Sequence, residues 1–183
     1  MNSEDISITN KLLSTAKKIV VVGHKNPDGD AVGSSLGLCN FLKQKGHHVQ
    51  VVMPNDFPDF LKWIPEASSI INYEQNFEET KTAIQKAEII FTLDFNALDR
   101  TGDLATELEQ AAADFILIDH HQQPDDYALV TYSDVAMCST SEMVFHFMEK
   151  LEGIQLLNKE IATQLYVGIM TDTGSFRFQT TTA

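Results

Sequence analysis

The stretch GHKNPDGDAVGS, residues 23–34, places an imidazole and two carboxylates in a glycine-rich turn. It follows residues 18–22, an apolar run with the length and composition of a buried strand, and it leads into apolar residues at helical spacing over residues 32–45. The turn therefore lies at the carboxyl end of a strand, the edge where open α/β sheets bind their ligands. The first candidate ligands are His24, Asp28 and Asp30.

Short apolar runs alternate with helical patterns along the whole chain. We expect strands at residues 18–22, 49–53, 88–93, 114–118 and 128–132. We expect helices at residues 3–17, 32–45, 77–86, 104–113 and 141–151, and a last one after the cap Asn158. This alternation predicts an α/β fold, a doubly wound and mostly parallel five-stranded sheet with helices on both faces. Residues 54–65 hold three prolines among aromatic residues and are expected to fold back onto the sheet.

Composition limits the class of protein. With 183 residues, of which 43% are hydrophobic and 21% charged, the chain matches one globular domain. No apolar run approaches the roughly 20 residues of a membrane span, and the start of the chain lacks the form of a signal peptide. We therefore expect a cytoplasmic protein without membrane partners. Cys39 and Cys138 form no CxxC pair and are expected to be buried free thiols.

The formal charge of −13 bears on the partners. Binding to long duplex nucleic acid needs clustered lysines and arginines, so this charge disfavours it. Small anions remain compatible, because bound divalent cations would neutralise the carboxylates of a metal site. The charge therefore does not exclude a small anionic substrate.

Acidic and imidazole residues end four separate segments. Besides the first turn, these residues are Asp94, the run Asp119, His120 and His121, and Asp172. Taken singly, an aspartate after a strand is often only a turn former or a helix cap. A fold that aligns the strand ends would bring all four segments together, and this predicts a shared site.

The four segments GHKNPDGDAVGS, LDFNALDR, IDHH and GIMTDTGSFRF resemble the successive motifs of the DHH phosphoesterases, in the same order. The resemblance extends over nearly the whole chain. That family includes RecJ-like exonucleases, family II pyrophosphatases, exopolyphosphatases and cyclic dinucleotide phosphodiesterases. It also includes enzymes that act both as oligoribonuclease (nanoRNase) and as 3′-phosphoadenosine 5′-phosphate phosphatase, and the run TDTGSFRFQTTT looks most like this last group.

The resemblance implies a site for two metal ions that share Asp94. One ion would be held by His24, Asp28 and Asp94, and the other by Asp30, Asp94, His120 and Asp172. Oxygen-rich sites with one imidazole each suit Mn²⁺ or Mg²⁺, whereas thiolates would have indicated zinc. We expect Mn²⁺, with Mg²⁺ or Co²⁺ as alternatives.

Further residues have candidate roles around these ligands. The resemblance implies that His121 is catalytic and contacts the phosphate or protonates the leaving oxygen, although it could instead support a ligand. Asp119 is expected to orient a ligand or to cap the strand end. Arg177 is a candidate catalytic and substrate-binding residue that could bind a phosphate with its planar fork, or it is an ordinary surface arginine.

Three hydroxyls and three histidines complete the candidates. Ser139, Thr140 and Ser141 precede a predicted helix, so they can cap it, while Ser139 and Thr140 are also candidate substrate ligands. We exclude from the site His47 and His48, expected in a solvated turn, and His146, expected within a helix.

The resemblance thus implies a Mn²⁺-dependent phosphoesterase that acts on short oligoribonucleotides and on 3′-phosphoadenosine 5′-phosphate. The expected partners are therefore short single-stranded RNA or small nucleotides. Cyclic dinucleotides, pyrophosphate and polyphosphate are rival substrates, and a catalytically silent nucleotide-binding module is the alternative outside the enzymes. Most family members carry a second domain with a GGGH-type motif, which residues 1–183 lack. We therefore expect one DHH catalytic domain, taken from a longer protein; a homodimer is left open.

Overall fold

Six parallel strands form one sheet in the order β3-β2-β1-β4-β5-β6 in the computed structural model, which describes residues 1–179 and 181. The strands are β1 Lys18–Val22, β2 His48–Met53, β3 Ile71–Asn72, β4 Ile89–Leu93, β5 Asp114–Asp119 and β6 Val130–Ser133. The parallel sheet is confirmed, but the expectation of five strands is wrong. The additional strand, β3, has only two residues and is defined by its pairing with Val52 and Met53 of β2.

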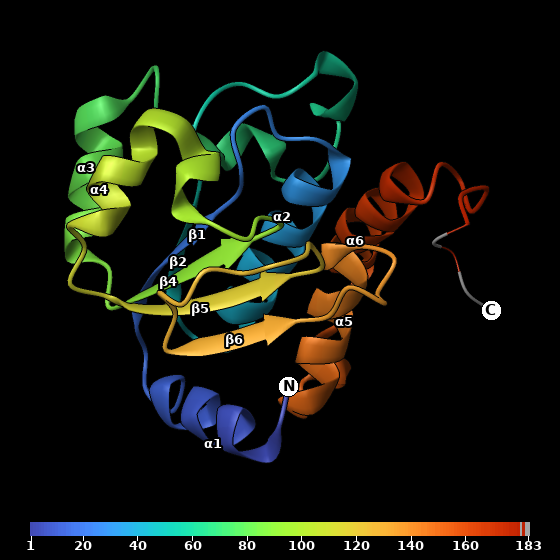
Figure 1. Ribbon diagram of the computed structural model, residues 1–183, viewed down its shortest axis with the longest axis horizontal. Helices are drawn as coiled ribbons and strands as arrows, with labels where there is room; N and C mark the ends of the chain where they lie inside the picture. The colour runs from blue at the N-terminus through green and yellow to red at the C-terminus, as the bar shows by residue number, and fades with distance from the viewer. Residues whose placement is uncertain (180, 182–183) are drawn as a thin grey trace.

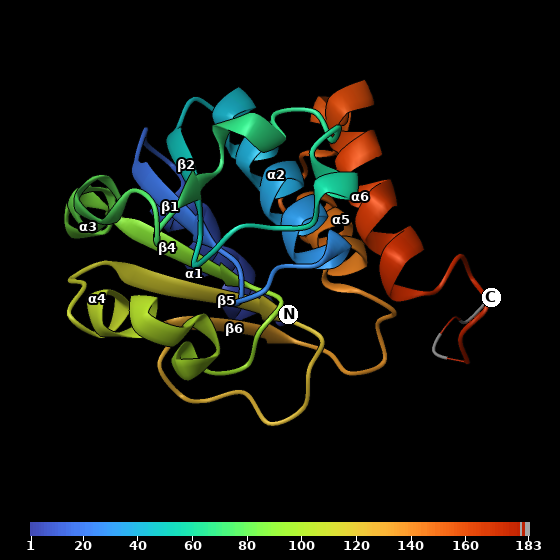
Figure 2. The same ribbon diagram turned by 90° about the horizontal axis from the view of Figure 1, so that it is seen from above.

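Helices cover both faces of the sheet, as predicted (Figures 1 and 2). The α-helices are α1 Ser3–Leu12, α2 Gly29–Gln44, α3 Phe77–Lys86, α4 Ala105–Glu109, α5 Thr140–Lys150 and α6 Lys159–Asp172. Short 3-10 helices are η1 Asp59–Leu61, η2 Ala67–Ser69, η3 Leu98–Leu104 and η4 Ile154–Leu156. Helices α2, α5 and α6 lie on one face, and α3 and α4 lie on the other.

Alternate residues of the strands divide the core into two layers. In β1, Ile19 and Val21 belong to the larger apolar cluster, which includes side chains of α2, α5 and α6. Val20 and Val22 point into the smaller cluster with residues of α3 and α4. Burial on both faces is why the strands are near-continuous apolar runs instead of alternating ones.

Helices α2 and α6 pack closely where two glycines meet. A Cβ atom on Gly33 would lie 3.0 Å from the backbone nitrogen of Gly168, and a Cβ atom on Gly168 would lie 2.7 Å from Oδ1 of Asp30, so neither position has room for a side chain. Both helices carry candidate metal ligands, Asp30 in the first turn of α2 and Asp172 at the end of α6. The glycine contact therefore sets the distance between two parts of the candidate site.

The strand order reverses between β1 and β4. From β1 the chain adds β2 and β3 on one side, and it then crosses over to add β4, β5 and β6 on the other. The carboxyl ends of β1 and β4 therefore flank the crevice in which doubly wound sheets bind ligands. His24 follows β1 and Asp94 follows β4, so both residues lie at this crevice.

Residues 54–65 fold back onto the sheet as expected. Phe57, Leu61 and Ile64 are buried in the larger core cluster, whereas Phe60 and Trp63 are exposed. The expectation of a solvated His47 is wrong, because its side chain is 5% exposed and its Nδ1 accepts a hydrogen bond from the backbone nitrogen of Lys17. Within the described residues, no helix has both the length and the apolar character to cross a membrane.

Candidate metal centre

The loop between β1 and α2 is shaped by the cap of the helix that follows it. Oδ1 of Asp28, the N-cap residue, accepts hydrogen bonds from the backbone nitrogens of Asp30 at 2.9 Å and Ala31 at 3.0 Å. Such a cap satisfies donors that the first helical turn leaves unpaired. It also fixes Asp30 in that turn, where the side chain is buried.

Two imidazoles are oriented in the same way. Nδ1 of His24 donates to the carbonyl oxygen of Lys25 at 2.9 Å, and Nδ1 of His120 donates to that of Met137 at 3.3 Å. A hydrogen bond at Nδ1 sets the tautomer and leaves Nε2 free to bind a metal. In both residues Nε2 is the nitrogen that faces the aspartates.

Asp94 lies between these two imidazoles. Its Oδ2 is 3.6 Å from Nε2 of His24, and its Oδ1 is 3.6 Å from Nε2 of His120. The side chain is 3% exposed, and the backbone adopts a left-handed conformation with φ of 66°, which is strained for a residue other than glycine. Strained, buried polar residues of this kind cluster at functional sites.

The structure brings together all six ligands expected from the sequence. His24, Asp28 and Asp94 offer ligand atoms that lie within 4.8 Å of one another, and Asp30, His120 and Asp172 form a second such group. Asp94 also forms a third group with His120 and His121. The two oxygens of Asp94 thus face ligands of both groups, as expected of a carboxylate that bridges two ions.

The amino end of α5 holds two of these carboxylates. The backbone nitrogens of Thr140 and Ser141 donate to Oδ2 and Oδ1 of Asp30 at 2.6 and 2.9 Å. The Thr140 hydroxyl donates to Oδ1 of Asp94 at 2.9 Å. Thr140 thereby links one ligand of each group.

The hydroxyls before α5 are engaged inside the protein. Ser139 is the N-cap, accepting a hydrogen bond from the backbone nitrogen of Glu142 at 3.1 Å, as the sequence predicts. Ser139 and Thr140 are both 0% exposed. This burial does not fit the expectation that they bind substrate directly, and it favours a role in positioning Asp30 and Asp94.

Charge is concentrated in this small volume. Burial and the negative charge of Asp94 raise the pKa of Asp30 well above its usual range. Burial also raises the pKa of Asp172, where the charge of His120 opposes the effect and that of Asp94 adds to it. For Asp94, burial acts in the same direction, but the hydrogen bond and charge of His24 lower the pKa overall. A divalent cation would stabilise these carboxylates.

His121 is held by a buried carboxylate. Its Nδ1 lies 2.7 Å from Oδ1 of Asp119, which is 0% exposed. The hydrogen bond to Asp119 raises the pKa of His121, although burial acts in the opposite direction. About half of the His121 side chain is exposed, so its Nε2 is left available for a ligand.

Arg177 does not join this group. Its side chain is exposed, and its Nε donates to the carbonyl oxygen of Gly174 at 2.8 Å, within its own turn. Among the described residues, no hydrogen bond or ion pair connects it with the six ligands. The arginine that lines a hollow beside Asp94 is Arg100, which the sequence reasoning missed although it ends the quoted segment LDFNALDR.

The donor set fits hard divalent cations. Each group of three combines carboxylate oxygens with imidazole nitrogen, and no metal-binding group among the described residues includes a cysteine. Oxygen-rich ligands favour Mg²⁺ or Mn²⁺, and imidazole shifts the preference toward Mn²⁺. His24, Asp28, Asp30, Asp94, His120 and Asp172 are the residues that would hold such ions.

The family model described as "DHH family, N-terminal domain" matches residues 18–169. The chain belongs to the DHH family. The bifunctional oligoribonuclease and PAP phosphatase NrnA of Thermus thermophilus is 32% identical over 165 residues, covering 90% of this chain and 46% of that protein. The cyclic-di-AMP phosphodiesterase PdeA of Listeria monocytogenes is 24% identical over 178 residues, covering 93% of this chain and 27% of that protein.

Two solved structures have a fold similar to that of this chain. An exopolyphosphatase-related protein from Bacteroides fragilis is 40% identical with a TM-score of 0.96, covering 99% of this chain and 53% of that chain. Exonuclease RecJ bound to manganese has the same fold, with a TM-score of 0.55 at 18% identity, covering 92% of this chain and 42% of that chain. This DHH chain therefore spans about half the length of several of the proteins it matches, and a smaller part of PdeA.

Proposed function

We propose that this DHH domain is the catalytic domain of a phosphoesterase that uses two divalent cations, with Mn²⁺ as the preferred ion. The observation that carries the proposal is the position of Asp94, whose two oxygens face the imidazoles of His24 and His120 from two ligand groups. Two ions held there would supply positive charge beside a phosphate and would acidify a water molecule.

The residues around the ions have separate tasks in this proposal. The six ligands hold the ions, and the amino end of α5 keeps Asp30 and Asp94 in position. His121 is the proton donor to the leaving oxygen, because the bond to Asp119 favours its protonated form and keeps Nε2 accessible. Asp119 is a positioning residue that acts through His121.

The proposed substrates are short single-stranded oligoribonucleotides and 3′-phosphoadenosine 5′-phosphate. The similarity to NrnA of Thermus thermophilus supports this choice. A cyclic dinucleotide is the second candidate, supported by the similarity to PdeA. Both kinds of substrate present a phosphate ester to the same metal centre.

The test compares the protein with its Asp94→Asn variant on four substrates in the presence of Mn²⁺. These are a short oligoribonucleotide, 3′-phosphoadenosine 5′-phosphate, a cyclic dinucleotide and pyrophosphate. Asp126→Asn, at an exposed position, is the matched control. We expect Mn²⁺-dependent turnover in the protein and the control and none in Asp94→Asn.

A second readout separates loss of metal from loss of fold. Mn²⁺ should raise the melting temperature of the protein, because it binds the folded state only. Asp94→Asn should keep its circular dichroism spectrum but lose this increase. Normal turnover and a normal Mn²⁺ stabilisation in Asp94→Asn would refute the proposal, and turnover of pyrophosphate alone would refute the proposed substrates.

A further inference from the structure

A hollow of about 580 Å³ opens beside the metal centre. It is lined by residues 94–97, 99 and 100 of the segment after β4, and by His121 and Gln122 of the segment after β5. Its volume lies within the range of roughly 300–1,000 Å³ that is usual for sites of small molecules. Because Asp94 and His121 form part of its wall, a molecule in this hollow would reach the reacting atoms.

The walls of the hollow are fixed by hydrogen bonds. Nδ2 of Asn96 donates to the carbonyl oxygen of Gln122 at 2.8 Å, and the backbone nitrogen of Asp125 donates to the carbonyl oxygen of Asn96 at 2.8 Å. The backbone nitrogen of Lys25 donates to the carbonyl oxygen of Arg100 at 2.9 Å. Arg100 is thereby tied to the residue that follows His24, and the hollow needs little rearrangement to accept a ligand.

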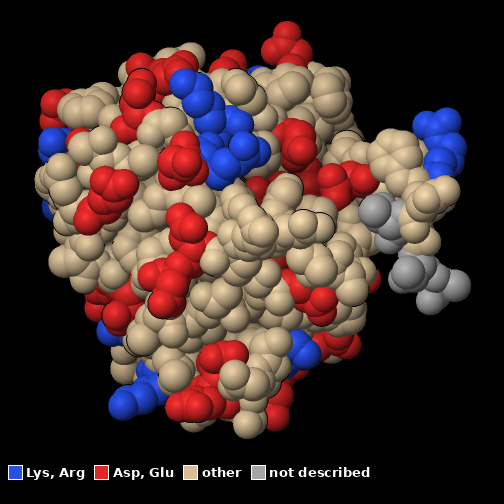
Figure 3. All heavy atoms as spheres, in the orientation of Figure 1, with Lys and Arg blue, Asp and Glu red and all other residues tan. Residues whose placement is uncertain are grey.

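Arg100 brings a positive charge to this acidic region. The chain has two arginines, and Arg177 is bonded within its own turn. The Arg100 side chain is exposed and forms no ion pair with the described residues, whereas neighbouring Lys25 is 4.0 Å from Glu74. Figure 3 shows basic side chains gathered over the β1–α2 loop and η3, beside acidic ones. The guanidinium of Arg100 is therefore available for an anionic ligand.

We propose that Arg100 binds a second phosphate of the substrate while the metal centre acts on the first, and that the hollow holds the nucleoside between them. This proposal rests on the proposed function. Oligoribonucleotides and nucleoside bisphosphates both carry two phosphates separated by a sugar. The planar guanidinium can hold a phosphate through two parallel hydrogen bonds, which a lysine cannot match. Arg100 would thus select nucleotides with two phosphates over monophosphates.

The test uses adenosine compounds that differ only in the second phosphate. The protein and Arg100→Gln are compared on 3′-phosphoadenosine 5′-phosphate, adenosine 3′-phosphate and adenosine 5′-phosphate with Mn²⁺. Loss of a charged hydrogen bond pair should raise KM for the bisphosphate by roughly 10- to 100-fold. It should leave kcat/KM for whichever monophosphate is hydrolysed unchanged, because that compound places its single phosphate at the metal centre and lacks the second phosphate that Arg100 holds.

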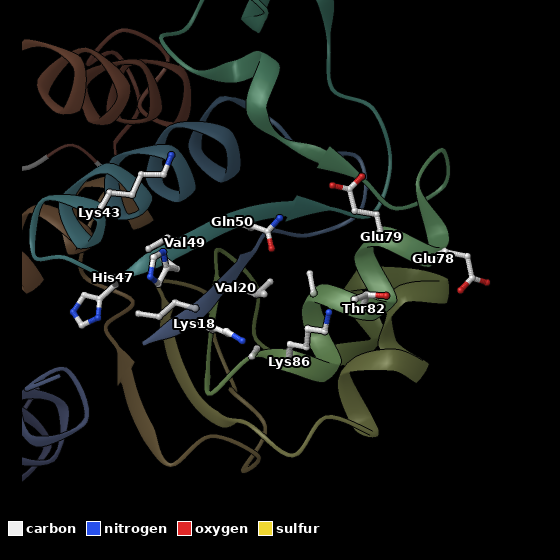
Figure 4. A pocket seen from close by; sticks show the side chains of 14 residues that line it. Lys18, Val20, Lys43, His47, Val49, Gln50, Glu78, Glu79, Thr82 and Lys86 are labelled. Carbon is white, nitrogen blue, oxygen red and sulfur yellow. The ribbon is translucent and has the colours of Figure 1, made fainter. Parts of the chain in front are cut away.

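A hollow at the opposite edge of the sheet supplies the matched control. It has a volume of about 810 Å³ and lies at the amino ends of β1 and β2, where Lys18 and Lys86 line it (Figure 4). Lys86→Gln removes the same charge as Arg100→Gln but far from the metal ligands. Its kinetic constants should equal those of the parent. The kinetic constants of Arg177→Gln should also equal those of the parent. This variant tests whether Arg177, the arginine expected from the sequence to bind phosphate, has that role instead of Arg100.

A binding measurement keeps this proposal separate from the proposed function. Calorimetric titration with 3′-phosphoadenosine 5′-phosphate in the presence of Ca²⁺ needs no turnover. Arg100→Gln should bind the bisphosphate roughly 10- to 100-fold more weakly than the parent and bind Mn²⁺ equally well. Equal bisphosphate affinity, or an equal loss of affinity for the monophosphate that is hydrolysed, would overturn the role of Arg100. Inactivity of the parent on every phosphoester would instead overturn the proposed function.

Discussion

Replacement of Thr140 by valine tests whether its hydroxyl positions the metal ligands. Valine has nearly the same shape, so Thr140→Val removes the donor to Oδ1 of Asp94 without opening a cavity. The backbone nitrogen of residue 140 can still donate to Asp30. The substitution therefore isolates one hydrogen bond.

The size of the effect follows from burial and charge. Thr140 is 0% exposed and its 2.9 Å bond goes to a carboxylate that is 3% exposed, so no water can replace the lost donor. A hydrogen bond to a buried charged group contributes about 2 kcal/mol. For a domain of this size the loss corresponds to a fall in melting temperature of about 4–8 °C. Loosening a bridging ligand should also weaken Mn²⁺ binding by about 10- to 100-fold.

Thermal melts of the metal-free protein and calorimetric titration with Mn²⁺ measure the two effects. Thr140→Ser is the decisive comparison, because it keeps the hydroxyl and loses only a buried methyl group. It should lose about 1 kcal/mol of stability and keep the parent's Mn²⁺ affinity. If Thr140→Val binds Mn²⁺ as tightly as the parent, or if both variants lose affinity equally, the hydroxyl does not position Asp94.

Three further predictions concern the same region and the thiols. Burial and the charge of Asp94 raise the folded-state pKa of Asp30, so Mn²⁺ binding at pH below that pKa should release a proton, and the affinity should increase as pH rises toward it. As pH rises from the unfolded-state pKa of about 4 through the raised folded-state pKa, the metal-free protein should lose the stability that protonated Asp30 contributes. Calorimetric titrations with Mn²⁺ in buffers of different ionisation enthalpy measure the released protons, and thermal melts at several pH values measure the loss of stability. A Mn²⁺ affinity that does not change with pH would contradict the raised pKa of Asp30. Gly168→Ala would place a Cβ atom 2.7 Å from Oδ1 of Asp30, so it should cost about 1–3 kcal/mol and weaken Mn²⁺ binding, whereas a parent-like melt and titration would argue against this contact. Burial raises the pKa of Cys39 and of Cys138 to about 11, so Ellman's reagent should modify both slowly in the native protein at about pH 8 and quickly in denaturant; equal rates would be inconsistent with these pKa values.

Long apolar runs made the sheet predictable. The run of residues 18–22 is buried on both faces of the sheet, and such strands give a strong signal along the sequence. Strand β3 gives none, because its two residues depend on pairing with the end of β2. Helix α4 is shorter than expected because the residues before it form the 3-10 helix η3. The backbone of η3 turns at Gly102, where φ is 62°.

The meeting of His24, Asp94 and His120 was predictable because they follow β1, β4 and β5, and parallel strands align their carboxyl ends. Asp172 ends helix α6, so its place among the ligands came from the resemblance to the family motifs. The roles of the Ser139 and Thr140 hydroxyls were not predictable. A hydroxyl residue before a helix gives the same sequence pattern whether it caps the helix, binds substrate or holds another side chain. Thr140 meets Asp30 across 110 positions of sequence, and only the packing of α5 determines this contact. Helix α1 ends at Leu12 although the pattern extends to residue 17; the hydroxyl of Ser14 donates back to the carbonyl oxygen of Lys11.

The close contact of Gly33 with Gly168 affects how mutational tolerance in this domain should be interpreted. A side chain at Gly33 would press on the backbone of α6, the helix that carries Asp172. A side chain at Gly168 would press on Ser141 and on the carboxylate of Asp30. A scan of all single substitutions, scored by metal-dependent turnover, would find Gly33 and Gly168 as intolerant to substitution as the metal ligands. Intolerance to substitution therefore identifies residues that position the ligands of a metal centre as well as the ligands themselves. A metal-binding assay is needed to distinguish these two kinds of residue.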